Sequence, residues 1–375
     1  MTCHLINNTG EAASMDTTNN ISGKHKILYY NTGFDILYEK KLLKEWGLDD
    51  VEIISVDIPQ LTLEMAVNMY NCDGSSANDS PDETTCDDTF YDIFGYLFNP
   101  AEIEACVVIY EKFTENVFEK MPNLKLISME SIGYNNIDIE AAKKHGVMVS
   151  NMPGYCVEEV ALHTVGLLLD LSRQITFLNN KVHEKIWNPF AGYEMHRLKD
   201  KTFGMVFFGE IPKRIVPMVK GLGMNILVYA PTKSQQYIES FGCQKADTLD
   251  ELLISSDVVS LHCPLIENVT YHLIGEHEFD LMKDRAFLIN TSRGAVVDEN
   301  ALYTALSSGK IRAAAIDMFE KEKYINENFL KLDNIIITPH SAFMSQDAID
   351  ECRIRGIDNI IRLLVNHKQP LNVVN

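Results

Sequence analysis

The stretch from residue 286 to residue 340 constrains the fold of this chain most strongly. It contains three short apolar runs, AFLIN (286–290), AAAID (313–317) and NIIIT (334–338). Between the first two lies a segment with a helical pattern, residues 298–311, which has an acidic start and a Gly-Lys end. Continuous apolar runs that alternate with helices are typical of buried parallel strands. The stretch therefore predicts a strand–helix–strand unit followed by another parallel strand.

Four chemically useful residues lie at or just after the ends of these predicted strands: Arg293, Asp317, Glu322 and His340. In open parallel sheets, ligands bind just beyond the carboxyl ends of the strands. A guanidinium, two carboxylates and an imidazole can therefore converge on one crevice, although they are far apart in sequence. Each residue alone has an ordinary structural explanation, such as a loop or a helix cap. Their joint placement in consecutive strand–loop units favours a catalytic site.

This set suits the reduction of a 2-oxo acid, which needs a hydride donor, a cation for the carboxylate and carbonyl, and an acid. Arg293 offers a planar fork that matches a carboxylate. His340 titrates near neutrality and can donate the proton. Glu322, hydrogen-bonded to His340, would favour the protonated imidazole and fix its orientation. Asp317 could accept a hydrogen bond from the carboxamide of a nicotinamide ring.

The chain is long enough for two domains, and alternating strand and helix patterns indicate α/β architecture in both. Residues 1–24 are rich in Asn, Thr and Ser and are expected to form a disordered extension. Residues 25–152 with 353–375 are expected to form a substrate domain, and residues 153–352 a doubly wound dinucleotide-binding domain. A single long amphipathic helix is predicted over residues 157–178, just after the domain boundary. The acidic segment 71–88 is interpreted as a surface loop, in preference to a metal site.

Composition narrows the possible partners. The formal net charge of −20 argues against a nucleic acid or an anionic membrane as partner. No apolar run approaches the ~18 residues that span a bilayer, and the N-terminal segment lacks the features of a secretory signal. The eight cysteines are scattered without zinc-ligand spacing, which indicates reduced thiols, a cytoplasmic protein and no metal site.

A candidate cofactor turn follows the predicted strand that begins near residue 202. Dinucleotide-binding turns carry Gly-x-Gly-x-x-Gly, and here the corresponding positions are Phe207, Gly209 and Pro212. Only the middle glycine remains, which allows close approach of a pyrophosphate to a helix N-terminus. A chance glycine in a strand–helix turn is the alternative explanation.

The next predicted strand ends in Ala230 instead of the carboxylate that usually binds the ribose 2′-OH. Thr232 and Lys233 follow, and a hydroxyl and a cation suit a 2′-phosphate better than a bare diol. The sequence therefore leans towards NADP(H) over NAD(H). The alternative is that Lys233 is a solvated turn residue.

Several segments resemble the signature regions of the D-isomer-specific 2-hydroxyacid dehydrogenases. They are INTSRGAVVDENALYTAL, AAAIDMFEKE, NIIITPHSAF, the upstream LHCPLIENVTYHLIGEHEFDLMKDR, and LKLISMESIGYNNIDIEAAKKHGVMVSNMPG. The segments TPHSAFMSQDAIDECR and VEEVALHT are also similar to the C-terminal binding protein branch. The resemblance covers residues 124 to the C-terminus. It implies two Rossmann-like domains, one flavodoxin-like and one NAD(P)-binding, with the active site in the cleft between them.

The resemblance also implies roles for individual residues. Arg293 would bind the substrate carboxylate and carbonyl, His340 would be the acid/base, and Glu322 would pair with it. Backbone amides of Ile132 and Gly133 would hold the substrate carboxylate, and Phe343 would wall the pocket. The implied cofactor contacts are Gly209, Glu210, Ile211 and Pro212 at the pyrophosphate, Thr232 and Lys233 near the ribose, Cys263 and Pro264 on the adenine side, and Thr291, Ser292 and Asp317 at the nicotinamide.

The leading hypothesis is thus an NAD(P)H-dependent oxidoreductase that interconverts a small 2-oxo acid and a D-2-hydroxy acid. The family resemblance suggests a homodimer. One alternative is a nucleotide-sensing, dimerising protein of the C-terminal binding protein kind with little turnover. Another is a protein that keeps the fold but no longer binds dinucleotide.

Overall fold

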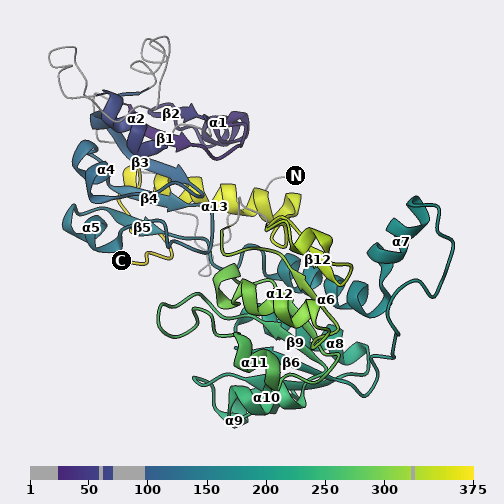
Figure 1. Ribbon diagram of the computed structural model, residues 1–375. Helices are drawn as coiled ribbons and strands as arrows, with labels where there is room; N and C mark the ends of the chain where they lie inside the picture. Colours follow the sequence, from purple (N-terminus) through teal and green to yellow (C-terminus); the bar gives the residue numbers. More distant parts are fainter. Residues whose placement is uncertain (1–23, 59–61, 71–97, 322–325) are drawn as a thin grey trace, which may run out of the picture. The chain divides into compact units, whose positions relative to one another are not determined.

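The computed structural model describes residues 24–58, 62–70, 98–321 and 326–375 (Figure 1). The predicted extension up to residue 23, the predicted loop at 71–88 and Glu322 lie outside the described residues. The chain divides into two compact units. Unit 1 comprises residues 1–153 and 353–375, and unit 2 comprises residues 154–352. Each unit is described by itself below.

Unit 1 is built on a five-stranded sheet with the order β2-β1-β3-β4-β5. All four pairings are parallel. This is the flavodoxin-like strand order, which confirms the prediction of a parallel α/β sheet. The strands are β1 His25–Tyr30, β2 Val51–Val56, β3 Ile103–Val108, β4 Leu126–Met129 and β5 Met148–Ser150.

Helices cover both faces of this sheet because its strands are apolar on both sides. Ile127 and Met129 point into one core cluster, whereas Leu126 packs with Ile357 and Ile360 of the C-terminal helix in another. The helices are α1 Leu37–Glu45, α2 Leu63–Tyr70, α4 Glu115–Lys120, α5 Ile139–Lys144 and the later part of α13 Gln346–Leu364, with a 3₁₀ turn η1 Pro100–Glu102.

A buried polar cluster lies on the α13 side of this sheet. Arg353 donates from Nε to Glu39 Oε1 at 2.6 Å and from Nη2 to Glu39 Oε2 at 2.7 Å. The Glu130 carboxyl, just after β4, is buried nearby, and a Cβ on Gly356 would lie 3.2 Å from its Oε1. Burial, with repulsion from Glu39, raises the pKa of Glu130 to about 8 although Arg353 opposes the shift. Glu130 therefore remains protonated in the folded protein at neutral pH.

Glu130→Gln should flatten the pH dependence of the stability of unit 1. Between the ordinary carboxyl pKa of 4.5 and about 8, the folded chain holds a proton that the unfolded chain has lost. Stability therefore falls as pH rises, by up to ~1.4 kcal/mol per pH unit for this one group. Urea unfolding at pH 5 to 8, followed by Trp46 fluorescence in a Trp187→Phe background, measures this slope. Glu140→Gln, at an exposed carboxylate, is the control; an unchanged slope in Glu130→Gln would contradict the prediction.

Unit 2 is built on a seven-stranded sheet with the order β12-β11-β10-β9-β6-β7-β8, and all its pairings are parallel. This confirms the predicted doubly wound sheet, with the chain switching direction across the sheet at β6 and β9. The strands are β6 Thr202–Val206, β7 Asn225–Tyr229, β8 Gln244–Lys245, β9 Val258–Leu261, β10 Phe287–Asn290, β11 Ala313–Ile316 and β12 Ile335–Ile337.

Two helical layers enclose this sheet (Figure 1). One layer, with α6 and α8, shares a core cluster with strand residues such as Met205 and Ile289, and the other, with α10 to α12, packs on Val206 and Leu288. The helices are α6 Val157–Arg173, α7 Ile175–His183, α8 Glu210–Gly221, α9 Gln235–Ser240, α10 Leu249–Ser255, α11 Glu276–Leu281 and α12 Glu299–Ser307, with 3₁₀ turns η2 Gly294–Val296 and η3 Phe329–Lys331. Among the described residues, no helix is long and apolar enough to cross a membrane.

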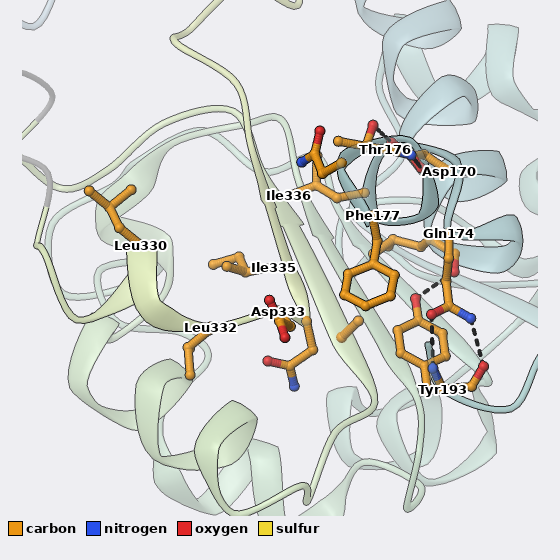
Figure 2. A pocket seen from close by; sticks show the side chains of 14 residues that line it. Asp170, Gln174, Thr176, Phe177, Tyr193, Leu330, Leu332, Asp333, Ile335 and Ile336 are labelled. Carbon is orange, nitrogen blue, oxygen red and sulfur yellow. Dashed lines mark hydrogen bonds between the residues drawn. The ribbon is translucent and has the colours of Figure 1, made fainter. Parts of the chain in front are cut away.

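The prediction of one helix over residues 157–178 is wrong. The helix ends at Arg173, and Gln174 adopts a left-handed conformation (φ 53°) before α7 begins. The Gln174 side chain accepts from Tyr193 N at 2.9 Å and donates to Tyr193 O at 2.6 Å (Figure 2). Asp170 accepts from the N–H of Thr176 and so satisfies an early donor of α7. These contacts stabilise the break against the continuing apolar pattern.

Candidate active site

The Asp317 carboxylate holds the loop that carries His340 through hydrogen bonds. It follows β11, is fully buried, and accepts hydrogen bonds from three groups of the loop after the neighbouring strand β12. Thr338 Oγ1 donates to Asp317 Oδ1 at 2.5 Å, Ser341 N donates to the same oxygen at 2.9 Å, and Ala342 N donates to Oδ2 at 3.0 Å. The carboxylate therefore fixes the loop on both sides of His340.

His340 itself lies in an unusual backbone conformation, with φ of 50°. Its N–H donates to the backbone oxygen of Asp317 at 2.6 Å. Its ring meets Phe343 edge-on, with centroids 6.0 Å apart, and Phe343 contacts the ring of Tyr155 at 6.4 Å. A non-glycine residue in this region is strained and needs support from its surroundings. The Asp317 anchor supplies that support.

The Arg293 turn follows β10, the strand that pairs with β11. Asn290 organises this turn: its Nδ2 donates to Arg293 O at 2.8 Å, and its Oδ1 accepts from Ser292 N at 3.0 Å and Ser292 Oγ at 2.8 Å. Gly294 packs directly on the backbone after β11, because a Cβ there would lie 2.1 Å from the carbonyl carbon of Phe319. The turn that carries Arg293 is thus held against the segment that follows Asp317.

These contacts bring the carboxyl ends of β10, β11 and β12 together with three of the predicted residues, Arg293, Asp317 and His340. Thr291 and Ser292 are buried in the same turn, and Thr291 Oγ1 lies 2.9 Å from Thr164 Oγ1 of α6. Glu322, the fourth predicted residue, is outside the described part of the chain. Arg293 and His340 follow β10 and β12, the two strands on either side of β11, and their catalytic roles stay predictions.

The predicted pyrophosphate turn joins β6 to α8. Gly209 is the N-cap of α8, Glu210 and Ile211 begin the helix, and Pro212 is buried in its first turn. A Cβ on Gly209 would meet no atom within 4 Å, so open space lies over the helix N-terminus. Phe207 stands at the position of the first glycine of the usual motif and takes φ of 71°, the conformation that glycine normally supplies. Phe207 thus adopts a left-handed conformation at the position where the motif carries its first glycine, and the predicted role of the turn stays a prediction.

Two basic residues beside this turn are engaged elsewhere. Lys213 Nζ donates to Glu210 Oε1 at 2.6 Å, and this bond raises the pKa of Lys213. Arg214 Nε lies 2.9 Å from Glu158 Oε1. Both side chains are therefore paired with carboxylates of the described residues.

The predicted ribose and adenine contacts lie at the ends of β7 and β9. Ala230 is buried, whereas Thr232 and Lys233 are exposed, and Lys233 Nζ lies 5.4 Å from the centroid of the Tyr237 ring. No carboxylate among the described residues pairs with Lys233. Cys263 is buried, which raises the pKa of its thiol to about 11, and Pro264 is exposed. Cys263 is therefore a buried neutral thiol.

The predicted substrate contacts of unit 1 follow β4. Ile132 O accepts from Asn151 Nδ2 at 2.8 Å, and Gly133 O accepts from Ser131 Oγ at 2.7 Å. Both bonds involve the carbonyl oxygens of Ile132 and Gly133. The predicted binding of the substrate carboxylate by their backbone N–H groups therefore stays a prediction. Both residues lie in a turn at the carboxyl end of a central strand, where parallel sheets bind ligands.

A cavity of about 210 Å³ lies elsewhere in unit 2, between the α6–α7 break and the edge strand β12 (Figure 2). Asp333 and Asn334, which precede β12, line it together with Phe177 and Tyr193. It is smaller than the ~300 Å³ that small-molecule pockets usually reach. Because it lies at the amino end of β12, it is separate from the residues that follow the strands' carboxyl ends.

Sequence reasoning missed two residues that contact the His340 loop. His163 Nε2 lies 3.1 Å from Thr338 Oγ1, and Glu159 Oε1 accepts from Ser345 Oγ at 2.7 Å. The two residues are four positions apart on α6, a spacing that places them on one helix face. The sequence shows the four-residue spacing of Glu159 and His163. It does not show which loop these side chains contact.

Comparisons with known proteins show which family the chain belongs to. The family described as D-isomer specific 2-hydroxyacid dehydrogenase, NAD binding domain, matches residues 165–342. A glyoxylate reductase of Thermococcus litoralis is 40% identical over 284 residues, which cover 73% of this chain and 84% of that protein.

Two solved structures share the fold along most of the chain. The apo-structure of D-lactate dehydrogenase from Escherichia coli has a TM-score of 0.72 at 27% identity and covers 93% of this chain and 100% of its own. An acyclic imino acid reductase solved with NADPH and D-Arg has a TM-score of 0.74 at 25% identity, with 93% and 100% covered. The chain therefore belongs to the D-isomer-specific 2-hydroxyacid dehydrogenase family and is an NAD(P)H-dependent oxidoreductase that interconverts 2-oxo acids and 2-hydroxy acids.

Proposed function

We propose that this enzyme reduces glyoxylate or a similarly small 2-oxo acid, with Arg293, Glu322 and His340 as its catalytic residues. The observation that carries the proposal is the anchoring of the His340 loop on Asp317, next to the turn that carries Arg293. The 40% identical relative is a glyoxylate reductase, which supports a small substrate.

In the proposed reaction, the bound nicotinamide supplies the hydride. The Arg293 guanidinium holds the substrate carboxylate and polarises the carbonyl oxygen, where negative charge develops. His340 donates the proton to that oxygen, and Glu322 orients the imidazole and favours its protonated form. Ile132 and Gly133 would bind the carboxylate through backbone amides, and Phe343 would wall the pocket near the substrate side chain.

The residues present fit a dinucleotide. Gly209, Glu210, Ile211 and Pro212 would hold the pyrophosphate, because the N-cap of α8 is open above Gly209. Cys263 and Pro264 would line the adenine, and Thr291 and Ser292 the nicotinamide end. Asp317 stays a proposed contact for the carboxamide through Oδ2, which accepts one described hydrogen bond, from Ala342.

The enzyme is expected to prefer NADPH to NADH. Ala230 places no carboxylate where a 2′-phosphate would bind, and Thr232 and the cation of Lys233 lie next in the chain. Lys233→Ala should lower kcat/KM for NADPH about tenfold and leave that for NADH nearly unchanged, as expected for loss of one charged hydrogen bond. The NADH value is the internal control. A wild-type enzyme that uses NADH with the higher kcat/KM would contradict the proposal.

The catalytic function is tested by the loss of absorbance at 340 nm with NADPH and NADH. We expect oxidation with glyoxylate, and comparison with hydroxypyruvate, pyruvate and an aromatic 2-oxo acid defines the size of the substrate. A nucleotide-sensing protein is the second candidate. The reported relatives are reductases and a dehydrogenase, which does not favour it. No turnover on any substrate, with assembly that depends on nucleotide, would favour the sensor.

A homodimer formed through unit 2 is also proposed. Trp187 and Phe190, after α7, are each 88% exposed within the chain, and Leu162 and Ile175 on α6 and α7 are exposed as well. Exposed apolar side chains that gather into one patch mark association surfaces, and the proposal is that these four side chains lie in such a patch. Sedimentation velocity at micromolar concentration tests this, and a single monomeric species would contradict it.

A cytoplasmic location completes the proposal. No disulfide links the five cysteines of the described part of the chain, and all five are buried. Buried thiols without disulfides are typical of a reducing compartment. Cell fractionation that places the protein outside the cytoplasm would overturn this assignment.

A further inference from the structure

The loop after β12, residues 338–345, is tied to helix α6 at both of its ends. At its start, His163 Nε2 lies 3.1 Å from Thr338 Oγ1. At its end, Ser345 Oγ donates to Glu159 Oε1 at 2.7 Å. Glu159 and His163, called the α6 pair below, are four residues apart and therefore share one face of the helix. His340 and Phe343 lie in the segment between the two ties.

The donor and acceptor in the contact between His163 and Thr338 follow from the other hydrogen bond of Thr338, to Asp317. Asp317 accepts from Thr338, Ser341 and Ala342, as an ionised carboxylate does. The single hydroxyl proton of Thr338 is therefore used on Asp317 Oδ1, and Thr338 Oγ1 must accept from His163 Nε2–H. His163 Nε2 also lies 3.7 Å from Asp317 Oδ1. The imidazole thus supports the hydroxyl and the carboxylate that anchor the loop.

The second tie fixes where the loop ends. Ser345 Oγ accepts from Ala348 N at 2.9 Å in the first turn of α13, while it donates to Glu159. The hydroxyl thus bridges the two helices, and the start of α13 is held to α6. A partly buried ring contact between Tyr155, just before α6, and Phe343 adds a third point of support.

The backbone of His340 needs this support because its φ is 50°. Strained conformations persist only where the surroundings over-determine them, and they cluster at functional sites. Asp317 holds the middle of the loop and the α6 pair holds its ends. Displacement of a reacting group by ~1 Å can lower a rate ~100-fold.

We infer that Glu159 and His163 are positioning residues of the reaction, which hold both ends of the loop so that the His340 imidazole stays aimed at the carbonyl oxygen. The inference rests on the proposed role of His340. Their described contacts to the loop and its anchor are with Thr338, Asp317 and Ser345, so we expect their effect to pass through these residues.

Paired substitutions separate positioning from packing. His163→Leu removes the donor, whereas His163→Gln keeps an N–H at the same reach. Glu159→Leu removes the acceptor, whereas Glu159→Gln keeps an oxygen for Ser345. Ser172→Ala is the matched control, because Ser172 is a buried hydroxyl of the same helix that bonds only to Leu169 O among the described contacts.

We expect His163→Leu to lower kcat for glyoxylate by ~10- to 100-fold with KM for NADPH changed less than about twofold. His163→Gln should recover most of kcat, and Ser172→Ala should match the wild type. The double variant with Glu159→Leu should show a smaller loss than the product of the single losses, because both act on one loop. The pH profile of kcat/KM should shift in His163→Leu and not in Ser172→Ala.

Hydrogen exchange gives a readout that does not depend on activity. The amides of Ser341 and Ala342 should exchange faster in His163→Leu and Glu159→Leu, and not in the Gln variants. Unchanged exchange together with kcat within twofold of the wild type in both Leu variants would overturn the inference. If exchange were faster in the Leu variants but the wild-type protein reduced no 2-oxo acid, the support of the loop by Glu159 and His163 would stand. The proposed function would then be contradicted instead.

Discussion

His340→Asn is expected to lower kcat for 2-oxo acid reduction by ~10²- to 10⁴-fold, the range that general acid catalysis supplies. Asn tolerates positive φ, so the substitution keeps the conformation that His340 adopts at φ 50°. The backbone N–H still donates to Asp317 O, and the loop should remain in place. Steady-state kinetics at saturating substrate measure the loss, and NADPH binding by fluorescence should be unchanged.

The control for this experiment is His277→Asn, at an exposed histidine of α11 in the same unit. It should retain wild-type kcat. If His340→Asn kept more than a tenth of the activity, His340 could not be the proton donor, and another group near Arg293 would have to take that role.

Arg353→Met is expected to destabilise unit 1 by ~3–5 kcal/mol, because it leaves a buried carboxylate without its partner. The Glu39 side chain is fully buried and is bound through both oxygens by Arg353. Arg353 Nη2 also donates to Asp35 O at 2.6 Å, and the guanidinium lies 4.8 Å from the centroid of the Tyr38 ring. Urea unfolding monitored by Trp46 fluorescence measures the free energy of unfolding.

Two further variants show whether the effect is electrostatic. Arg362→Met, on the same helix, loses an exposed bond to Gln369 O and an attraction to the Asp358 carboxyl, and should cost less than Arg353→Met because Arg362 binds no fully buried carboxylate among the described residues. The double variant Arg353→Met with Glu39→Leu removes both charges and should recover most of the stability. A double variant as unstable as the single one would show that packing by Arg353, and not charge pairing, is the larger contribution.

The strand–helix alternation made the two parallel sheets predictable, because buried parallel strands read as short apolar runs. The positions of Arg293, Asp317 and His340 were predictable for the same reason, since each follows a strand that pairs with the next. The resemblance to the dehydrogenase family was carried by those same segments.

Other features depend on contacts that are distant in sequence and carry no local signal. The apolar pattern of α6 continues past Arg173, and the break at Gln174 is set by its bonds to Tyr193, 19 residues later. The tie between His163 and Thr338 joins residues 175 positions apart. The burial of the Glu130 carboxyl likewise depends on packing against α13, which joins the chain more than 200 residues later.

The turn between β6 and α8 has a consequence for how such sites are recognised. Phe207 adopts φ of 71°, although a bulky residue there costs on the order of 1 kcal/mol. Its N–H donates to Tyr229 O at 2.7 Å, and its ring packs partly buried against the core of unit 2, which offsets that cost. By its glycines alone, this turn would not match the Gly-x-Gly-x-x-Gly motif, because only Gly209 is present. The φ of Phe207 shows that a residue with a side chain can take the left-handed conformation that glycine usually supplies at this position.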